Sequence, residues 1–278
     1  MDQTSLVTLL SGLPVSELRF YSSIDSTNDE AWRWVDAGAP HNALVVADEQ
    51  TAGRGRLHRR WVTAAGASLA FSLALLSPPL DSRWLPRLTG LGALAACLEL
   101  ENHHARSAEI KWPNDILLGG QKAGGVLVET RWQGTQLRAV VVGVGINIAS
   151  QSINPQVLPP GELNFPATCV EAALGQAVDR MDLLHGILKE FFLWQPKLGT
   201  PEFLHAWEDH LAFRGCWVEL RTDAGLRATS PQAEPALPAM GRLDGLAEDG
   251  SLRLVDPSGN PFTVQSAEIH LRPAGNPL

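Results

Sequence analysis

Apolar runs of strand length alternate with longer stretches of helical spacing along the first three quarters of the chain. The runs predict buried strands at residues 43–47, 68–76, 110–118, 125–129 and 137–144. Helices are predicted at residues 85–100, 181–194 and 202–211, where apolar residues recur every three or four positions. This order is typical of an α/β or α+β domain in which helices pack against a mixed β-sheet.

A further helix is predicted to start within residues 26–30, which read Ser-Thr-Asn-Asp-Glu. Thr27 and Glu30 have the spacing of a capping box, and an apolar stripe follows them from Ala31 onward. Residues 53–61 are rich in glycine and arginine and show no periodicity, so we expect a loop there.

After residue 215 the pattern changes to short strands separated by turns. Strands are predicted at residues 217–221, 241–246, 251–255 and 262–265, whereas residues 231–238 hold three prolines and predict a loop. This arrangement favours a small all-β module such as a five-stranded barrel. We therefore expect an α+β protein with two domains, residues 1–212 and residues 213–278.

Composition excludes several classes of protein. The net charge of −8 disfavours a nucleic-acid binder, and a hydrophobic content of 45% excludes a disordered chain. Three scattered cysteines and the lack of an H-E-x-x-H motif argue against a protein-bound metal and favour a reducing cytoplasm. The sequence shows no signal peptide and no apolar run of the roughly 18–20 residues that a membrane span needs.

The loop at residues 53–61 concentrates positive charge on this acidic chain. It reads Gly-Arg-Gly-Arg-Leu-His-Arg-Arg-Trp, with four arginines within seven positions. Guanidinium groups bind phosphate oxygens through paired hydrogen bonds, and glycine lets the backbone approach a ligand closely. The pattern favours a mobile loop that closes over an anion, and a solvated basic loop is the alternative.

Three other segments place polar residues or glycines at strand ends. In Lys111-Trp112-Pro113-Asn114-Asp115, the proline fixes a rigid corner from which the last two side chains point. Lys122 lies between two glycine pairs, and residues 143–147 read Gly-Val-Gly-Ile-Asn after a valine-rich strand. Each segment is also compatible with a plain structural turn, and no G-x-x-x-x-G-K-[ST] phosphate-binding loop is present.

In this order and spacing, five blocks of the sequence resemble the bacterial biotin–protein ligases. The blocks are Ser26-Thr27-Asn28, residues 50–56, residues 111–115, residues 122–129 and Gly145-Ile146-Asn147. The resemblance covers residues 20–150, weakens through the helical region, and returns at residues 241–255 and 266–272. It implies a biotin/lipoate ligase-like catalytic domain, with a mixed sheet and packed helices, followed by a small SH3-like β-barrel.

The resemblance also implies a reaction in two steps. Biotin is activated by ATP, with Mg²⁺, to biotinyl-5′-AMP, and is then transferred to a lysine of a biotin carboxyl carrier protein of acetyl-CoA carboxylase. Positive charge is required because two anions must meet, and closure of the loop would keep water from the adenylate. We expect a cytoplasmic enzyme with no nucleic-acid or membrane partner.

Matching positions assign residues to three groups. Biotin contacts fall on Ser26, Thr27, Asn28, Gln50, Arg54, Gly55, Arg56, Lys122 and Gly125. Nucleotide contacts fall on Arg54, Arg59, Trp61, Lys111, Asn114 and Asn147, with Phe165 as a further group packing near the adenine. The catalytic residues are Asp115, Lys122 and Arg56, and Asp115 either accepts the proton of the attacking lysine or orients its amine.

Two alternatives stay open: a non-catalytic regulator that binds biotin or its adenylate, and a lipoate or octanoate transferase of the same fold. The presence of Arg56, Asp115 and Lys122 together favours catalysis, and the arginine loop favours biotin. His58 departs from the family pattern, which usually has glycine there, and this affects how the loop orders. Only residues 1–25 precede Ser26, so we expect a short form without the helix-turn-helix domain of some members, either monomeric or homodimeric.

Overall fold

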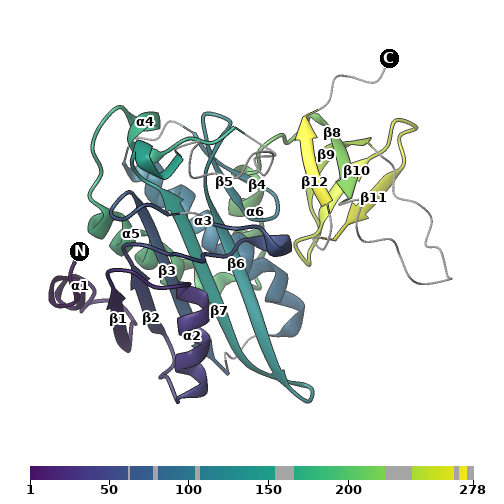
Figure 1. Ribbon diagram of the computed structural model, residues 1–278. Coiled ribbons are helices and arrows are strands. Elements are labelled where there is room, and N and C mark those ends of the chain that lie inside the picture. The colour runs from purple at the N-terminus through teal and green to yellow at the C-terminus, as the bar shows by residue number, and fades with distance from the viewer. Residues whose placement is uncertain are drawn as a thin grey trace.

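The structure, a computed structural model, describes residues 1–61, 63–77, 81–103, 107–153, 166–222, 240–265 and 269–273. Seven strands form a mixed sheet in the order β1-β2-β3-β7-β6-β5-β4 (Figure 1). They are β1 (Glu17–Tyr21), β2 (Ala43–Ala47), β3 (Ser68–Leu76), β4 (Ala108–Lys111), β5 (Asp115–Leu118), β6 (Gln121–Gln133) and β7 (Gln136–Asn147). β1 and β2 run parallel, and the other neighbouring pairs run antiparallel.

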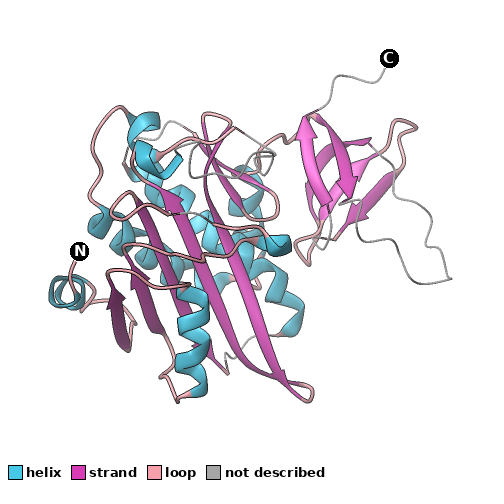
Figure 2. Ribbon diagram, viewed as in Figure 1, coloured by secondary structure: helices cyan, strands magenta, loops and turns pink. Residues whose placement is uncertain are grey.

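Helices cover both faces of this sheet, with α2 on one face and α3 and α5 on the other (Figure 1, Figure 2). The helices are α1 (Gln3–Leu9), α2 (Thr27–Asp36), α3 (Leu85–Asn102), α4 (Val170–Leu174), α5 (Arg180–Trp194) and α6 (Pro201–Asp209). Alternate residues of β2 serve the two faces: Leu44 and Val46 join the core under α3, whereas Ala43 and Val45 join a smaller cluster under α2. The predicted α+β class is confirmed.

The helix predicted near residue 26 is α2, but its cap differs from the predicted one. Ser26, not Thr27, is the N-cap, and its hydroxyl accepts a hydrogen bond from the backbone N–H of Asp29 at 3.4 Å. Thr27 is the first helical residue, so its hydroxyl is not used for capping. The sequence places three residues able to cap in a row, and spacing alone does not choose among them.

The strand predicted at residues 110–118 is wrong, because the chain reverses within it. β4 ends at Lys111, β5 begins at Asp115, and these two residues pair across an antiparallel ladder. Pro113 has no N–H to give to a ladder, and it lies in the turn between the two strands. This reversal puts Asn114 and Asp115 at the end of a hairpin.

A second, smaller antiparallel sheet has the order β11-β10-β9-β8-β12. Its strands are β8 (Trp217–Thr222), β9 (Met240–Leu246), β10 (Leu252–Val255), β11 (Pro261–Val264) and β12 (Ile269–Pro273). Four of them confirm predicted strands, and the sheet is compatible with an SH3-like domain. The proline-rich residues 231–238 lie outside the described part of the chain.

Three buried side chains tie the smaller sheet to the larger unit. The indole N–H of Trp112 donates to the carbonyl of Gly250 at 3.0 Å. Arg87 of α3 is 1% exposed and donates to the carbonyls of Leu198 and Glu248. Glu208 of α6 accepts from the backbone N–H of Leu246 at 2.6 Å. The turn between β9 and β10 therefore rests on the same corner as the β4–β5 hairpin.

Several elements were not predicted from the sequence, among them α1, β1 and α4. α1 buries only Leu6, so it lacks a helical apolar stripe. The side chain of Gln3 in α1 accepts from the N–H of Phe20 and donates to the carbonyl of Leu18, both on the edge strand β1. Among the described residues, none of the helices combines the length and apolar character required to span a bilayer.

Candidate active site

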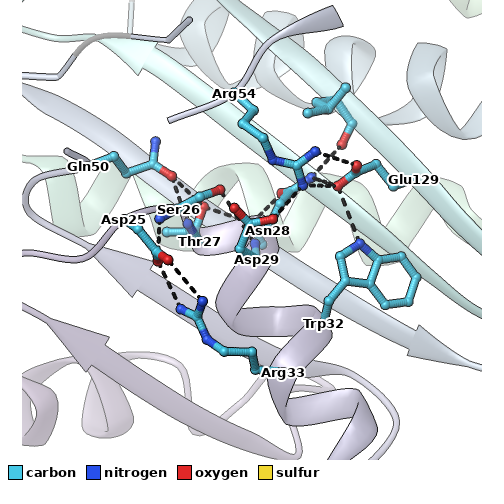
Figure 3. Close-up of polar contacts among 12 residues, drawn as sticks. Asp25, Ser26, Thr27, Asn28, Asp29, Trp32, Arg33, Gln50, Arg54 and Glu129 are labelled. Atoms are coloured by element: carbon cyan, nitrogen blue, oxygen red, sulfur yellow. Dashed lines mark hydrogen bonds and ion pairs between the residues drawn. The ribbon is translucent and has the colours of Figure 1, made fainter. Parts of the chain in front are cut away.

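Several predicted biotin contacts, among them Ser26, Thr27, Asn28 and Gln50, meet around the start of α2 (Figure 3). Ser26, Thr27 and Gln50 are all buried, and the carbonyl oxygen of the Gln50 side chain accepts two hydrogen bonds. One comes from the backbone N–H of Thr27 at 2.8 Å and the other from its hydroxyl at 3.0 Å. The backbone of Gln50 is in turn held by the hydroxyl of Thr63 at 2.6 Å. These polar groups are thus held in place by hydrogen bonds to one another.

Asn28 and Ser72 continue this buried polar group. The hydroxyl of Ser72, in the middle of β3, lies 2.8 Å from the hydroxyl of Thr27 and 2.6 Å from the side-chain oxygen of Asn28. Any side chain at position 143 on β7 would collide with the amide of Asn28, so Gly143 is required for this close approach. This explains the first glycine of the Gly-Val-Gly-Ile-Asn segment.

Arg54 reaches this group from the arginine loop. Its guanidinium makes two hydrogen bonds of 2.8 Å to the carboxylate of Glu129 and lies 2.8 Å from a carboxylate oxygen of Asp29. The hydrogen bond to Glu129 raises the pKa of Arg54. Burial alone would raise the pKa of Glu129, but hydrogen bonds from Arg54 and Asn28 outweigh it, and the pKa lies below its ordinary value.

The loop that carries Arg54 is closed at its base by backbone hydrogen bonds. The N–H of Trp61 donates to the carbonyl of Gly53 at 2.8 Å, and the N–H of Gly55 donates to Arg59 at 2.7 Å. Between them lies a single 3₁₀ turn, Arg56–His58, in which Leu57 adopts a left-handed conformation with φ 55°. A non-glycine residue thus provides this conformation one position before the unusual histidine.

A second cluster gathers the predicted catalytic residues. The ammonium of Lys122 donates to the carboxylate of Asp115 at 2.6 Å, and Arg56 donates to the side-chain oxygen of Asn114 at 3.2 Å. Burial lowers the pKa of Arg56, and the nearby carboxylate of Asp115 offsets part of that shift. Gly125 pairs with Asp115 on the neighbouring strand. Arg56 and Lys122 therefore reach two neighbouring residues, Asn114 and Asp115, from two elements.

Lys122 is presented by a tight hairpin. Gly119 and Gly120 both have positive φ, of 56° and 72°, so the first glycine pair serves the turn itself. The backbone of Lys122 is fixed on both sides, because its N–H donates to Pro166 and its carbonyl accepts from Thr168. The lysine is a rigidly mounted group rather than a loose surface side chain.

The predicted nucleotide contacts are less concentrated. Trp61 packs on β7, where a side chain at Gly145 would collide with its ring, and its buried indole N–H has no hydrogen-bond acceptor in the described part of the chain. Asn147 is buried and donates to the carbonyl of Thr168 at 3.2 Å. Lys111 is buried at the end of β4, Arg59 lies at the base of the loop, and Phe165 lies outside the described residues.

Four residues of the first cluster had no role in the sequence reasoning: Asp29, Trp32, Ser72 and Glu129. Trp32 donates its indole N–H to Glu129 at 3.3 Å. For Ser72 a signal exists, since it is a polar residue inside an otherwise apolar strand, and Glu129 directly follows the apolar residues Val126-Leu127-Val128. Such residues need partners when buried, and the partners here come from α2 and the loop. No cluster of three or more metal-ligating side chains occurs among the described residues.

Comparison with known proteins relates this site to a family. The model of the Biotin/lipoate A/B protein ligase family matches residues 20–147. A biotin–[acetyl-CoA-carboxylase] ligase of Paracoccus denitrificans is 33% identical over 253 residues, covering 88% of this chain and 96% of that protein. The bifunctional ligase/repressor BirA of Bacillus spizizenii is 38% identical over 171 residues, or 62% of this chain, and the match spans about half (51%) of that longer protein.

A solved structure, the biotin protein ligase of Aquifex aeolicus in complex with biotin and ATP, has the same fold. It superposes with a TM-score of 0.72 and 26% identity, covering 93% of this chain and 100% of that one. With a relative matched along almost its whole length, this chain belongs to the biotin/lipoate protein ligase family, on the side of the biotin protein ligases.

Proposed function

We propose that the chain is a biotin–protein ligase, which forms biotinyl-5′-AMP from biotin and ATP and transfers biotin to a carrier lysine. One observation carries the proposal: a single loop holds both Arg54 and Arg56. Arg54 reaches the polar residues at the start of α2, which we call the pocket on α2, and Arg56 reaches the cluster of Asp115 and Lys122. The loop thereby connects the residues proposed to recognise a polar ring with those proposed to activate a carboxylate. The names of the related ligases support this reading.

The pocket at α2 suits the ureido ring of biotin. That ring has two N–H donors and one carbonyl acceptor, and a buried site must satisfy all of them. Ser26, Thr27 and Gln50 supply hydroxyl and amide groups on rigid backbone. Octanoate or lipoate would leave these groups unpaired, so we expect the pocket to discriminate against both.

The second cluster suits the activation step. The carboxylate of biotin attacks the α-phosphorus of ATP, the bond to the β-phosphate oxygen breaks, and pyrophosphate leaves. Arg56 and Lys122 provide the positive charge that two approaching anions require, and both are held in place before the reaction. When bound with ATP, Mg²⁺ would neutralise the triphosphate. Arg59, Lys111, Asn114, Trp61 and Asn147 are proposed to bind the nucleotide.

Asp115 is proposed to act in the transfer step. In the structure its carboxylate is bound by Lys122 at 2.6 Å, so an anionic substrate that draws Lys122 away would release a carboxylate oxygen. That oxygen could take the proton of the attacking amine or orient it. Asp115→Asn with a pH–rate profile separates the two roles, because only a proton acceptor adds its own ionisation to the profile.

A carrier-labelling experiment tests the proposed function. The protein is incubated with ATP, Mg²⁺, biotin and a purified biotin carboxyl carrier domain, and the carrier mass is measured, with lipoate and octanoate in parallel. We expect the mass of one biotinyl group only with biotin and only with ATP. Labelling by lipoate would favour the transferase. Tight biotin binding without pyrophosphate release or labelling would favour a non-catalytic regulator.

The finer properties of the molecule are also proposals. A boundary between domains at residues 212 and 213 is supported by Ala212, which still bonds Ile110 of β4, and Gly215, which bonds Leu243 of β9. Free cysteines at positions 97, 169 and 216 support a cytoplasmic location. The acidic net charge supports the absence of a nucleic-acid partner, and monomer and homodimer remain the two candidate states.

A further inference from the structure

A continuous line of hydrogen bonds connects the arginine loop to the pocket on α2. It runs from Arg54 to Glu129, from Glu129 to Asn28 at 2.8 Å, from Asn28 to Ser72 at 2.6 Å, and from Ser72 to Thr27 at 2.8 Å. It ends at Gln50, 3.0 Å from the hydroxyl of Thr27. Figure 3 shows Glu129 on one side, within reach of Arg54 and Asn28, and Gln50 on the opposite side. Asn28 and Ser72 are buried and thus shielded from bulk water.

The direction of this line follows from which groups carry hydrogens. A carboxylate only accepts, so Asn28 must turn its NH₂ toward Glu129 and its oxygen toward Ser72. The amide oxygen of Asn28 has no hydrogen, so the proton in the 2.6 Å contact belongs to Ser72. Ser72 has one proton, and the proton in its 2.8 Å contact with Thr27 therefore comes from Thr27.

This direction decides what the pocket can offer to a ligand. The single proton of the Thr27 hydroxyl is used toward Ser72, so Thr27 presents only lone pairs to a ligand. The side-chain oxygen of Gln50 faces Thr27 and accepts its backbone N–H at 2.8 Å, so Gln50 offers a ligand its NH₂ group. Thr27 as acceptor and the NH₂ group of Gln50 as donor are together complementary to the ureido ring, in which an N–H lies next to a carbonyl.

We propose that Glu129, acting through Asn28 and Ser72, is the positioning residue that sets the acceptor and donor pattern of the ureido pocket. The inference rests on the proposed function and adds a specificity device to it. Because the same carboxylate holds Arg54, the order of the loop and the polarity of the pocket depend on one charge. Asn28 and Ser72 fix the direction of the hydrogen bonds between Glu129 and Thr27. Their hydrogen bonds in this line involve neither Arg54 nor the second cluster.

Glu129→Gln and Ser72→Ala test this role in different ways. A glutamine at 129 has both hydrogens and lone pairs, so the line can run in either direction, whereas Ser72→Ala cuts it without touching Arg54. For both variants we expect the KM for biotin to rise about 10-fold, by the magnitude of a buried hydrogen bond. In Ser72→Ala, which leaves the bond between Glu129 and Arg54 intact, the KM for ATP should stay within about twofold. A merely structural role would lower the active fraction and move both substrates alike.

A substrate analogue gives the sharper readout. In a cyclic carbamate analogue of biotin, ring oxygen replaces one ureido N–H, so an acceptor stands where biotin has a donor; the two possible isomers are both assayed by pyrophosphate exchange. The wild-type protein should prefer biotin over the isomer that faces Thr27. In Glu129→Gln this preference should shrink about 10-fold, because Thr27 can now donate.

Three further variants are measured, two as controls and one as a test of the pocket. Asp29→Asn removes the other carboxylate at Arg54 but leaves Asn28 untouched, so the preference for biotin over the carbamate should be unchanged. Asp36→Asn, which breaks the exposed ion pair to Arg131 between the same helix and strand, is the control for general effects. Thr27→Val tests the pocket itself and should raise the KM for biotin.

The outcomes separate the two proposals. If Thr27→Val raises the KM for biotin, while Glu129→Gln and Ser72→Ala leave both KM and preference within twofold of wild type, the role of Glu129 is refuted and the pocket stands. If Thr27→Val also has no effect, the assignment of the pocket to biotin is refuted with it. Thermal unfolding verifies each variant, and if one of the pair does not fold, the other decides.

Discussion

The two polar clusters that flank the arginine loop differ in what ligand binding would require of them. In the pocket on α2, hydroxyls, amides and Glu129 already satisfy one another, and a ligand adds to bonds that persist. In the second cluster, Lys122 is occupied by Asp115, and it must exchange that partner for the substrate. The proposed recognition site therefore keeps its hydrogen bonds when a ligand binds, whereas the proposed activation site must break an ion pair.

Removing a charge from the second cluster should have the largest effect. Lys122→Ala is expected to lower the rate of biotinyl-adenylate formation about 10²–10³-fold, the usual loss for one preorganised charge at a reacting centre. Biotin-dependent pyrophosphate exchange measures it. Lys197→Ala, which loses an exposed ion pair to Glu202, is the matched control. Equal exchange rates in the two variants would remove Lys122 from the activation step.

Crowding the pocket should have the next largest effect. In Gly143→Ala the new methyl group collides with the amide of Asn28, which must shift and disturb Ser72. Overpacking of this kind costs about 1–3 kcal/mol, and we expect a higher KM for biotin and a lower Tm. Gly12→Ala, at a position with open space, is the control. An unchanged KM would show that Asn28 can move without consequence for biotin.

Trp112→Phe should have a moderate effect on stability and tests whether the second cluster depends on the smaller sheet. The ring keeps its packing but loses the hydrogen bond to the carbonyl of Gly250. We expect a loss of about 1 kcal/mol in the free energy of unfolding, measured by urea denaturation. The carrier-labelling rate should fall as well, because Asn114 and Asp115 follow directly. A stability equal to wild type would mean that water replaces the indole N–H without cost.

The smallest effect concerns acid stability beside the pocket. Hydrogen bonds from Arg33 lower the pKa of Asp25 to about 2, below its ordinary value of about 3.9. A lowered folded-state pKa contributes stability above about pH 4 that is lost as the pH falls toward 2. Thermal unfolding across this range should show a shallower acid loss in Asp25→Asn than in wild type. Parallel curves would contradict the role of the Arg33–Asp25 pair.

The sequence predicted the fold well where apolar pattern alone decides. β2 and β3 lie at the predicted residues because both are continuous buried runs. The prediction failed at residues 110–118, where a hairpin turn interrupts an apolar run, and at α1, whose position depends on Gln3 contacting the sheet edge. These features depend on partners distant in the sequence, which local pattern does not contain.

The candidate site shows the same division. Resemblance to the ligases identified the arginine loop, Asp115 and Lys122, and the structure brings Arg56, Asp115 and Lys122 together. Ser72 and Glu129 were not assigned, because their importance lies in the direction of hydrogen bonds across two strands and a helix. A polar residue within a buried strand is a signal that can be read from sequence, but its partner cannot.

The hydrogen bond from Trp112 to Gly250 joins positions 138 residues apart in the chain. During synthesis the corner that presents Asp115 therefore lacks the partner of its indole N–H until the turn between β9 and β10 has been made. A nascent or truncated chain would hold the charged groups of the site without the brace that fixes their corner.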